Sequence, residues 1–233
     1  MKIIALETST QPGSVAASEN DELLFSESLP EQEQTAESFA ESLQRMLQTL
    51  DWHPSSVDGI AVCEGPGSFT GLRIGITAAK TFHYATSAAV LAPSTMLILA
   101  HQAKLAATGK NVWCILDAQR GEVFATKYTL DNSSELIESN ATKILSPDEF
   151  ERVIDDADVI NGSGIGRIDT TLLNPAAICP KSAWVPSAAT LAICGSQMLK
   201  RGQIADAWTL VPQYYRRSAA EEKLLKSNEE ESS

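Results

Sequence analysis

Four side chains and one loop have the chemistry to bind a metal ion and a phosphate. Glu7, Thr8 and Ser9 follow an apolar run near the start of the chain, and Asp117 ends a similar run in the second half. Carboxylate and hydroxyl oxygens at such positions can arrange a metal ion with its water. The loop "GPGSFTG" (65–71) opens a helical pattern, and the free amides at a helix amino terminus attract anions. These residues are the candidates for nucleotide chemistry.

None of these stretches meets a strict nucleotide-binding motif. The loop has no lysine after its last glycine, and Gly67 and Gly71 are one residue too far apart for G-x-G-x-x-G. The three histidines have no metal-ligand spacing, and no serine lies in G-x-S-x-G. The sequence therefore predicts no catalytic residue, metal site or cofactor. A structural role for Glu7 and Asp117, as acids that tie down turns, is at least as well supported as a metal role.

The strands and helices that position these residues are predicted to occur in the same order in both halves of the chain. Strands are predicted over 2–9 and in the two segments that follow, then a helix over 35–50, a strand over 57–65 and a helix over 68–86. The same β-β-β-α-β-α order repeats from residue 111, where Ser146 and Pro147 mark the start of its first helix. A last helix is predicted over 187–200.

Two such units in tandem predict an α/β fold of the actin/Hsp70/sugar-kinase type, with two ribonuclease-H-like lobes. In that fold a nucleotide lies in the cleft between the lobes. We expect the first lobe over 1–105, with a segment of about 214–228 packing back on it, the second lobe over 106–213, and an acidic tail over 229–233.

The composition limits the partners and the compartment. Acidic residues outnumber basic ones by 30 to 18, giving a formal net charge of -12, so the chain alone is a poor nucleic-acid binder and would need a basic partner. The four cysteines have no paired spacing, which predicts buried free thiols. No signal peptide or membrane-spanning run is present, so we expect a cytoplasmic protein without a membrane partner.

The first two predicted helices carry apolar faces that could bind another protein. Small residues on one face of helix 68–86 would allow another element to approach closely, and a second apolar face lies beside it. The alternative, that both helices are covered by the fold itself, is equally compatible with the pattern. The predicted partner interface consists of Phe39, Leu43, Met46, Leu47, Leu50, Phe69, Leu72, Ile76 and His83.

The segment "GPGSFTGLRIGITAAKTF" resembles the hallmark of the bacterial TsaB family, also called YeaZ. "IIALETS", "APSTMLILA", "DAQRGEVFA" and "VPQYYRR" extend the resemblance along nearly the whole chain. The resemblance implies a non-catalytic scaffold or activator for the synthesis of N6-threonylcarbamoyladenosine (t6A) in tRNA. It implies heterodimers with TsaD, a larger complex with TsaE, and homodimers, all pairing through the first two helices. Since the chain is acidic, we further expect it to contact tRNA only indirectly, and nucleotide to bind only at a subunit junction, where two chains can jointly supply what one lacks.

Two other functions are compatible with parts of the sequence. A weak ATPase or kinase would use Glu7, Thr8, Ser9 and Asp117. A metallopeptidase of the glycoprotease type would need the histidine pair of TsaD-like proteins, but Met96 and Ala100 occupy those positions and His101 is one place out of register. Neither Met96 nor Ala100 can replace a histidine ligand, so the scaffold role is preferred.

Overall fold

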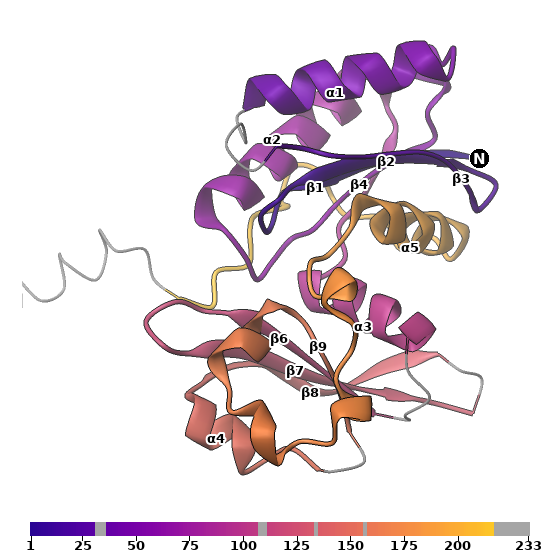
Figure 1. Ribbon diagram of the computed structural model, residues 1–233. Helices are drawn as coiled ribbons and strands as arrows, with labels where there is room; N and C mark the ends of the chain where they lie inside the picture. Colours follow the sequence, from indigo (N-terminus) through magenta and orange to yellow (C-terminus); the bar gives the residue numbers. More distant parts are fainter. Residues whose placement is uncertain (31–35, 107–110, 133–134, 156–157, 217–233) are drawn as a thin grey trace, which may run out of the picture.

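The computed structural model describes residues 1–30, 36–106, 111–132, 135–155 and 158–216, and shows two lobes, each built on one sheet (Figure 1). The first sheet has the order β3-β2-β1-β4-β5 and the second the order β8-β7-β6-β9. The strands of the first sheet are β1 (Lys2–Glu7), β2 (Ser14–Glu19), β3 (Glu22–Ser28), β4 (Gly59–Val62) and β5 (Ala89–Leu91). Those of the second are β6 (Asn111–Asp117), β7 (Val123–Leu130), β8 (Leu136–Leu145) and β9 (Val159–Asn161).

The predicted architectural repeat is confirmed by the pairing of the strands. β1 pairs antiparallel with β2 and parallel with β4, and β6 pairs in the same two ways with β7 and β9. The predicted two-lobed, ribonuclease-H-like fold is therefore correct. Only the first sheet gains a further parallel strand, β5, which had not been predicted.

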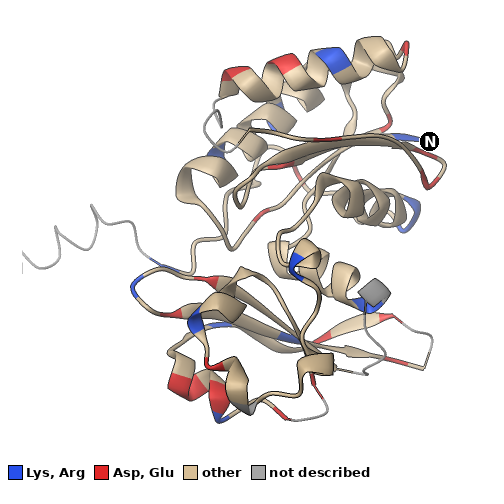
Figure 2. Ribbon diagram, viewed as in Figure 1, with Lys and Arg blue, Asp and Glu red and all other residues tan. Residues whose placement is uncertain are grey.

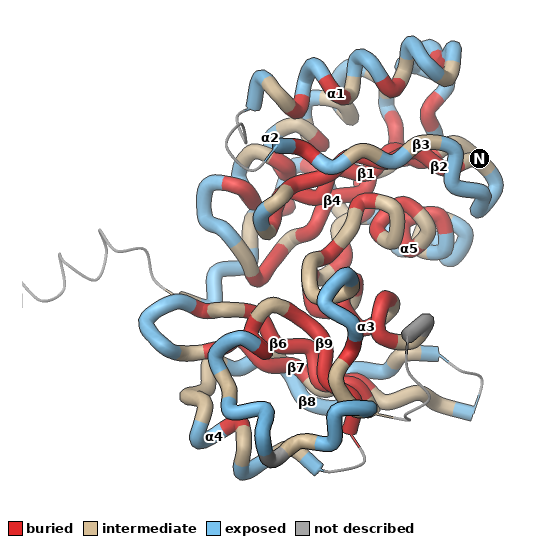
Figure 3. Tube along the Cα trace, viewed as in Figure 1, coloured by how far each residue is buried: buried red, intermediate tan, exposed pale blue. Residues whose placement is uncertain are grey.

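Two helices cover one face of the first sheet, namely α1 (Ala36–Thr49) and α2 (Phe69–Thr86). Alternation along β1 sends Ile4 and Leu6 toward these helices and Ile3 and Ala5 toward the opposite face. The buried positions of α1 face the sheet, while its outer side is exposed (Figure 3). Each face of the sheet therefore has its own apolar core.

The opposite face of the first sheet is covered by α5 (Ala188–Lys200), which comes from the far end of the chain. α3 (Thr95–Ala106), from the first half, packs instead on the second sheet, where Met96 and Leu99 meet Val112. α3 and α5 lie between the two sheets (Figure 1). The expected lobe 106–213 therefore differs from the structure, because α5 belongs with the first sheet. Its amphipathic pattern predicts a helix but does not say which sheet it covers.

The second lobe carries a reduced version of the helices of the first. α4 (Pro147–Glu151) begins with a capping box between Ser146 and Glu149, as the sequence predicted for its start. The glycines after β9 open a short 3₁₀ helix, Ser163–Arg167, in place of the long α2. On this outer face Trp113 meets Phe150 edge-on, with ring centroids 5.4 Å apart.

The cysteines are buried and free, as predicted. No helix in the described ranges combines the length and the apolar character needed to cross a bilayer. Most of the segment 214–228 that was expected to pack back on the first lobe, and the whole tail 229–233, lie outside the described residues.

Candidate functional site

A cleft of about 730 Å³ lies between the lobes, which is where the sequence analysis expected a nucleotide site to be sought. The end of β1 and the start of α2 form one wall, and the β6–β7 turn forms the other. A third part of the lining comes from the end of the described chain, residues 213–216. Of the four candidate residues, Ser9 and Asp117 line the cleft, whereas Glu7 and Thr8 do not.

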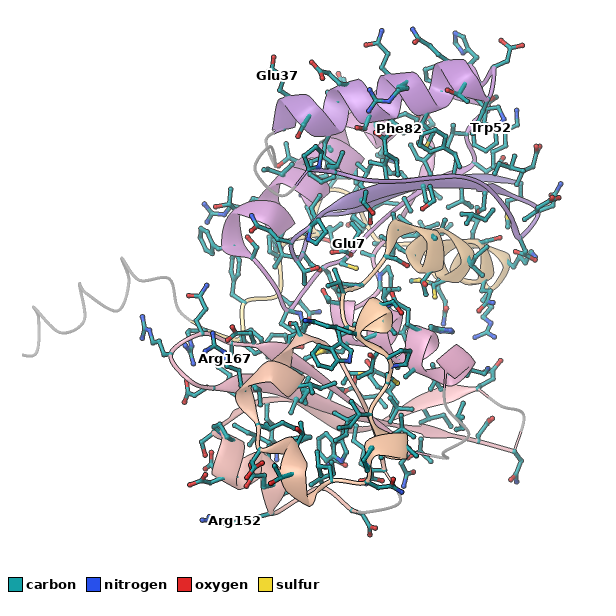
Figure 4. All side chains as sticks on the ribbon, viewed as in Figure 1. Glu7, Glu37, Trp52, Phe82, Arg152 and Arg167 are labelled. Carbon is teal, nitrogen blue, oxygen red and sulfur yellow. The ribbon has the colours of Figure 1, made fainter. Side chains whose placement is uncertain are left out.

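Glu7 points into the protein rather than into the cleft. Its side chain is fully buried between the first sheet and α5 (Figure 4), and its Oε1 accepts hydrogen bonds from the backbone amide of Ser9 (2.6 Å) and from the Ser9 hydroxyl. Burial raises the pKa of the Glu7 carboxyl, although the Cys63 and Ser9 hydrogen bonds oppose this rise. Because its carboxyl is buried and accepts from the amide and the hydroxyl of Ser9, Glu7 stabilises its own turn, which is the structural role that the sequence offered as an alternative.

The glycine-rich start of α2 packs directly against the end of β1. Ser68 caps the helix by accepting from the amide of Gly71 (3.2 Å), and its own amide donates to the Ser9 carbonyl (2.7 Å). A Cβ on Gly67 would lie 2.4 Å from the Ser9 carbonyl oxygen, and one on Gly71 would lie 1.9 Å from that of Thr8. The glycines therefore serve a backbone contact inside the first lobe.

Asp117 is held at the edge of the opposite wall. Its carboxylate pairs with the Arg167 guanidinium at 2.7 Å and accepts from the amide of Gln119 at 2.8 Å. Arg167 reaches it from the 3₁₀ helix of the second lobe (Figure 4). These contacts stabilise the turn after β6. This is the structural role for Asp117 that the sequence offered as an alternative to a metal role.

The segment Gln213–Arg216, here called the C-terminal strap, crosses the mouth of the cleft. On the first lobe, the backbone amide of Gln213 donates to the Glu64 carbonyl at 2.8 Å. The ring of Tyr214 stacks on that of Phe69 with centroids 4.7 Å apart, and its hydroxyl accepts from Arg73 Nε at 2.9 Å. These contacts fix the first half of the strap to α2 and to the loop after β4.

The second half of the strap contacts the other lobe. The ring of Tyr215 lies 6.1 Å from that of Phe124, and the Arg216 guanidinium pairs with Glu122. The strap therefore bridges the lobes. Sequence reasoning noticed "VPQYYRR" only through its resemblance, although aromatic and arginine residues together near the end of an acidic chain were an available signal.

The expected interface on the first two helices has to be corrected. Phe39, Met46, Leu72 and Ile76 are at most 4% exposed and belong to the interior of the chain. Because their apolar surface is already covered by the first sheet and its loops, they cannot also contact another protein without unfolding. Of the remaining five, Phe69 is exposed and contacts the strap. His83 Nδ1 donates to the Ala88 carbonyl at 2.8 Å, which closes the end of α2.

The residues that stay accessible on these helices line a shallow apolar groove of about 660 Å³. We call it the α1–α2 groove and define it by Ala40, Leu43, Leu47, Phe82 and Ala85, with Trp52 at one end. Figure 4 shows Trp52 and Phe82 beneath α1 on this side. Leu43 and Leu47 were among the predicted interface residues, whereas Phe82 and Ala85 were not.

Comparison with known proteins identifies the family. The family model described as "TsaD: tRNA N6-adenosine threonylcarbamoyltransferase" matches residues 29–148, more than half of the chain. A solved structure of YeaZ from Pseudomonas aeruginosa shares 28% sequence identity, covers 91% of this chain and 99% of its own, and superposes with a TM-score of 0.76. The chain belongs to the TsaB/YeaZ family.

Other TsaB/YeaZ proteins show the same relationship. The tRNA threonylcarbamoyladenosine biosynthesis protein TsaB of Bacillus subtilis is 29% identical over 78% of this chain and 80% of its own length. The protein of the same name from Escherichia coli is 28% identical over 64% of each. A second Pseudomonas aeruginosa structure, of a protein similar to YeaZ, covers 92% of this chain and 99% of its own with a TM-score of 0.81.

Met96 and Ala100, which the sequence resemblance aligned with the histidine pair of TsaD-like proteins, are packing positions in this TsaB/YeaZ chain. Met96 and Ala100 are fully buried between α3 and the second sheet. His101 is partly buried, and this burial lowers its pKa to about 4. The residues that the structure describes contain no group of three or more His, Cys, Asp or Glu side chains placed to hold a metal ion.

Proposed function

We propose that the chain is a non-catalytic accessory subunit for t6A synthesis in tRNA and that it binds and supports a TsaD-type transferase. The names of its TsaB relatives place those proteins in this biosynthesis. The observation that carries the non-catalytic part is the position of Glu7. The acid that would arrange metal and water in a nucleotide-hydrolysing relative is turned away from the cleft and holds its own turn.

The α1–α2 groove is the proposed docking site for the transferase and, in its absence, for a second copy of the chain. Leu43, Leu47 and Phe82 present partly exposed apolar surface there and also contact the core. A partner helix would therefore pack against side chains that the core already holds in place. TsaE would join through the transferase complex. Any nucleotide would bind where this chain meets a partner, not in its own cleft.

Two substitutions can block the groove without touching the core. Ala40 and Ala85 are exposed and line it, so Ala40→Glu and Ala85→Glu place a carboxylate where the partner would dock. An uncompensated buried charge costs about 3 kcal/mol or more, which is at least a hundredfold in Kd. Ala141→Glu, an exposed alanine on β8, is the matched control. Affinity for the transferase is measured by calorimetry, and t6A formation by mass spectrometry of reconstituted tRNA reactions.

The scaffold proposal expects no t6A from the transferase and TsaE without this chain, and loss of binding in both groove variants but not in the control. Undiminished modification without the chain would refute the function. Normal binding by Ala40→Glu and Ala85→Glu would refute the docking site alone. Hydrolysis of Mg-ATP by the purified chain, abolished by Asp117→Ala, would instead support the ATPase alternative.

A further inference from the structure

One stripe of α2 gathers exposed or half-buried cationic and aromatic side chains outside the α1–α2 groove. Phe69, Arg73, Lys80 and Tyr84 follow one another at intervals of four, seven and four residues and therefore share a helix face. Arg73 lies over the Phe69 ring, 3.9 Å from its centroid, and Tyr84 is 80% exposed. The groove uses Phe82 and Ala85, which lie on a different side of the helix.

The segment before the strap runs antiparallel along this stripe. Asp206 lies near Lys80 at one end, and Tyr214 stacks on Phe69 at the other. Ala207 and Leu210 turn into the core, while Trp208 remains 79% exposed. We call the combined surface of Phe69, Arg73, Lys80, Tyr84, Trp208 and Tyr214 the α2 strip. The fifteen residue-to-residue steps from Phe69 to Tyr84, at 1.5 Å each, give it a length of about 22 Å.

The charge of the α2 strip is opposite to that of the whole molecule. α2 contains no Asp or Glu, and in the segment 206–216 beside it the only acid is Asp206, next to Lys80, although the chain has a formal net charge of -12. Figure 2 shows the acidic residues on other elements, including α1 and α4. Among the described residues, every large exposed aromatic side chain lies on α2 or in the strap and the segment before it. Cations and aromatic rings are thus concentrated on one face.

We propose that the α2 strip contacts single-stranded nucleotides of an RNA, and that it supplements binding by a partner subunit. Unpaired bases stack on Tyr and Trp rings and phosphates pair with Arg and Lys, so RNA would use both components of the strip. An acidic protein surface would use the cations but would leave Trp208 and Tyr84 without a stacking partner. The two cations of the strip, Arg73 and Lys80, are too few for tight binding by an acidic chain alone.

This inference rests on the proposed function, because it assigns the tRNA of that reaction as the RNA. It departs from the expectation that tRNA reaches this subunit only indirectly. The contact is a positioning one: the strip would hold an unpaired loop while the partner carries out the transfer. No residue of the strip is assigned a chemical step.

The test combines binding with a map of the contact. An unmodified tRNA transcript is titrated into the complex with the TsaD-type partner, and complex formation is measured separately by gel filtration. The variants are Trp208→Ala and Lys80→Gln. Ile137→Ala and Lys143→Gln are the controls, since both positions are exposed on β8 of the other lobe. The same tRNA is also crosslinked by ultraviolet light to the complex and to the chain alone, and the adducts are located by mass spectrometry.

Each strip variant should raise the Kd for tRNA about fivefold or more, with no effect of the controls, and Lys80→Gln should also reduce the slope of log K against log salt by about one. Crosslinks are expected at Trp208 or Tyr84. Unchanged tRNA affinity in a complex that forms normally would overturn the inference while leaving the proposed function intact. So would a loss of affinity for the partner protein instead of tRNA. If no complex forms, the proposed function fails. The crosslinking of the free chain then tests the inference separately, and the absence of adducts at Trp208 and Tyr84 overturns it as well.

Discussion

Replacing Gly71 with alanine tests whether the glycine-rich start of α2 is a packing contact or a phosphate cradle. The new Cβ would lie 1.9 Å from the Thr8 carbonyl oxygen and 3.1 Å from its carbon. Both sides of this clash are backbone, so β1 and α2 must move apart by roughly 1 Å or more. Overpacking of this kind costs about 3 kcal/mol at the upper end of its usual range.

Alanine also favours the helix over glycine by about 1 kcal/mol, which offsets part of that cost. The net loss of unfolding free energy is therefore about 2 kcal/mol, which for a chain of this size lowers Tm by about 4–8 °C. Gly75→Ala should cost less, because its Cβ would meet the Thr8 hydroxyl (2.4 Å), a side-chain atom that can rotate away. At Gly166 a Cβ would have no neighbour within 4 Å, so Gly166→Ala is the matched control.

The assay is scanning calorimetry of the purified proteins, with and without Mg-ATP. The packing role expects a low Tm for Gly71→Ala in both conditions and a Tm within about 1 °C of the parent for Gly166→Ala. If Gly71→Ala has the same Tm as Gly166→Ala, the start of α2 does not pack closely against the backbone at the end of β1. A parent protein whose Tm rises in Mg-ATP, with the rise lost in Gly71→Ala, would indicate a phosphate cradle.

Three further predictions concern buried charged or titratable groups. Asp158 is buried and accepts from Trp113 Nε1 (2.9 Å) and Lys127 (2.8 Å), so Asp158→Ala, which leaves the Lys127 ammonium unpaired, should lower the unfolding free energy in urea by about 3 kcal/mol. Burial holds the pKa of His101 at about 4, below its ordinary 6.5, so the unfolded chain binds more protons between these values and stability falls as pH falls. His101→Gln should remove up to about 3 kcal/mol of that acid-induced loss in urea melts between pH 7 and 4.5. Burial raises the folded-state pKa of Glu7, so its contribution to the free energy of unfolding is present at low pH and is lost as the pH rises through that pKa. Glu7→Gln should therefore raise Tm at pH 8 relative to the parent, with a smaller gain at pH 4.

The strands and amphipathic helices could be predicted because their patterns are local. β1 alternates between two covered faces and ends at Glu7, and the Ser146 cap marks the start of α4. No strand or helix was predicted over 89–106, where β5 and α3 occur. α3 lies between α5 and the second sheet, so Met96, Ile98, Leu99 and Ala100 are all buried and the run shows no polar face from which a helical period could be recognised.

The candidate site was harder to predict because the role of each residue depends on which way its side chain points, and residue type does not reveal this. Sequence patterns show that Phe39, Leu43 and Met46 share a helix, but not that the sheet covers Phe39 and Met46 while Leu43 stays in the groove. They also cannot show that Glu7 turns inward. The strap was missed for a related reason: Tyr214 meets Phe69 across 145 positions of sequence, and no local period records such a contact.

The crossed placement of α3 and α5 has a consequence for how the chain can be divided. A fragment ending near residue 106 would lack α5, and Ile3, Ala5 and Ala61 on its sheet would be left facing water. The complementary fragment would lack α3, which covers Val112, Cys114 and Leu116. Each half therefore depends on a helix that the other half encodes, so the chain should melt in one cooperative step, and fragments cut at this point should acquire structure only when they are mixed.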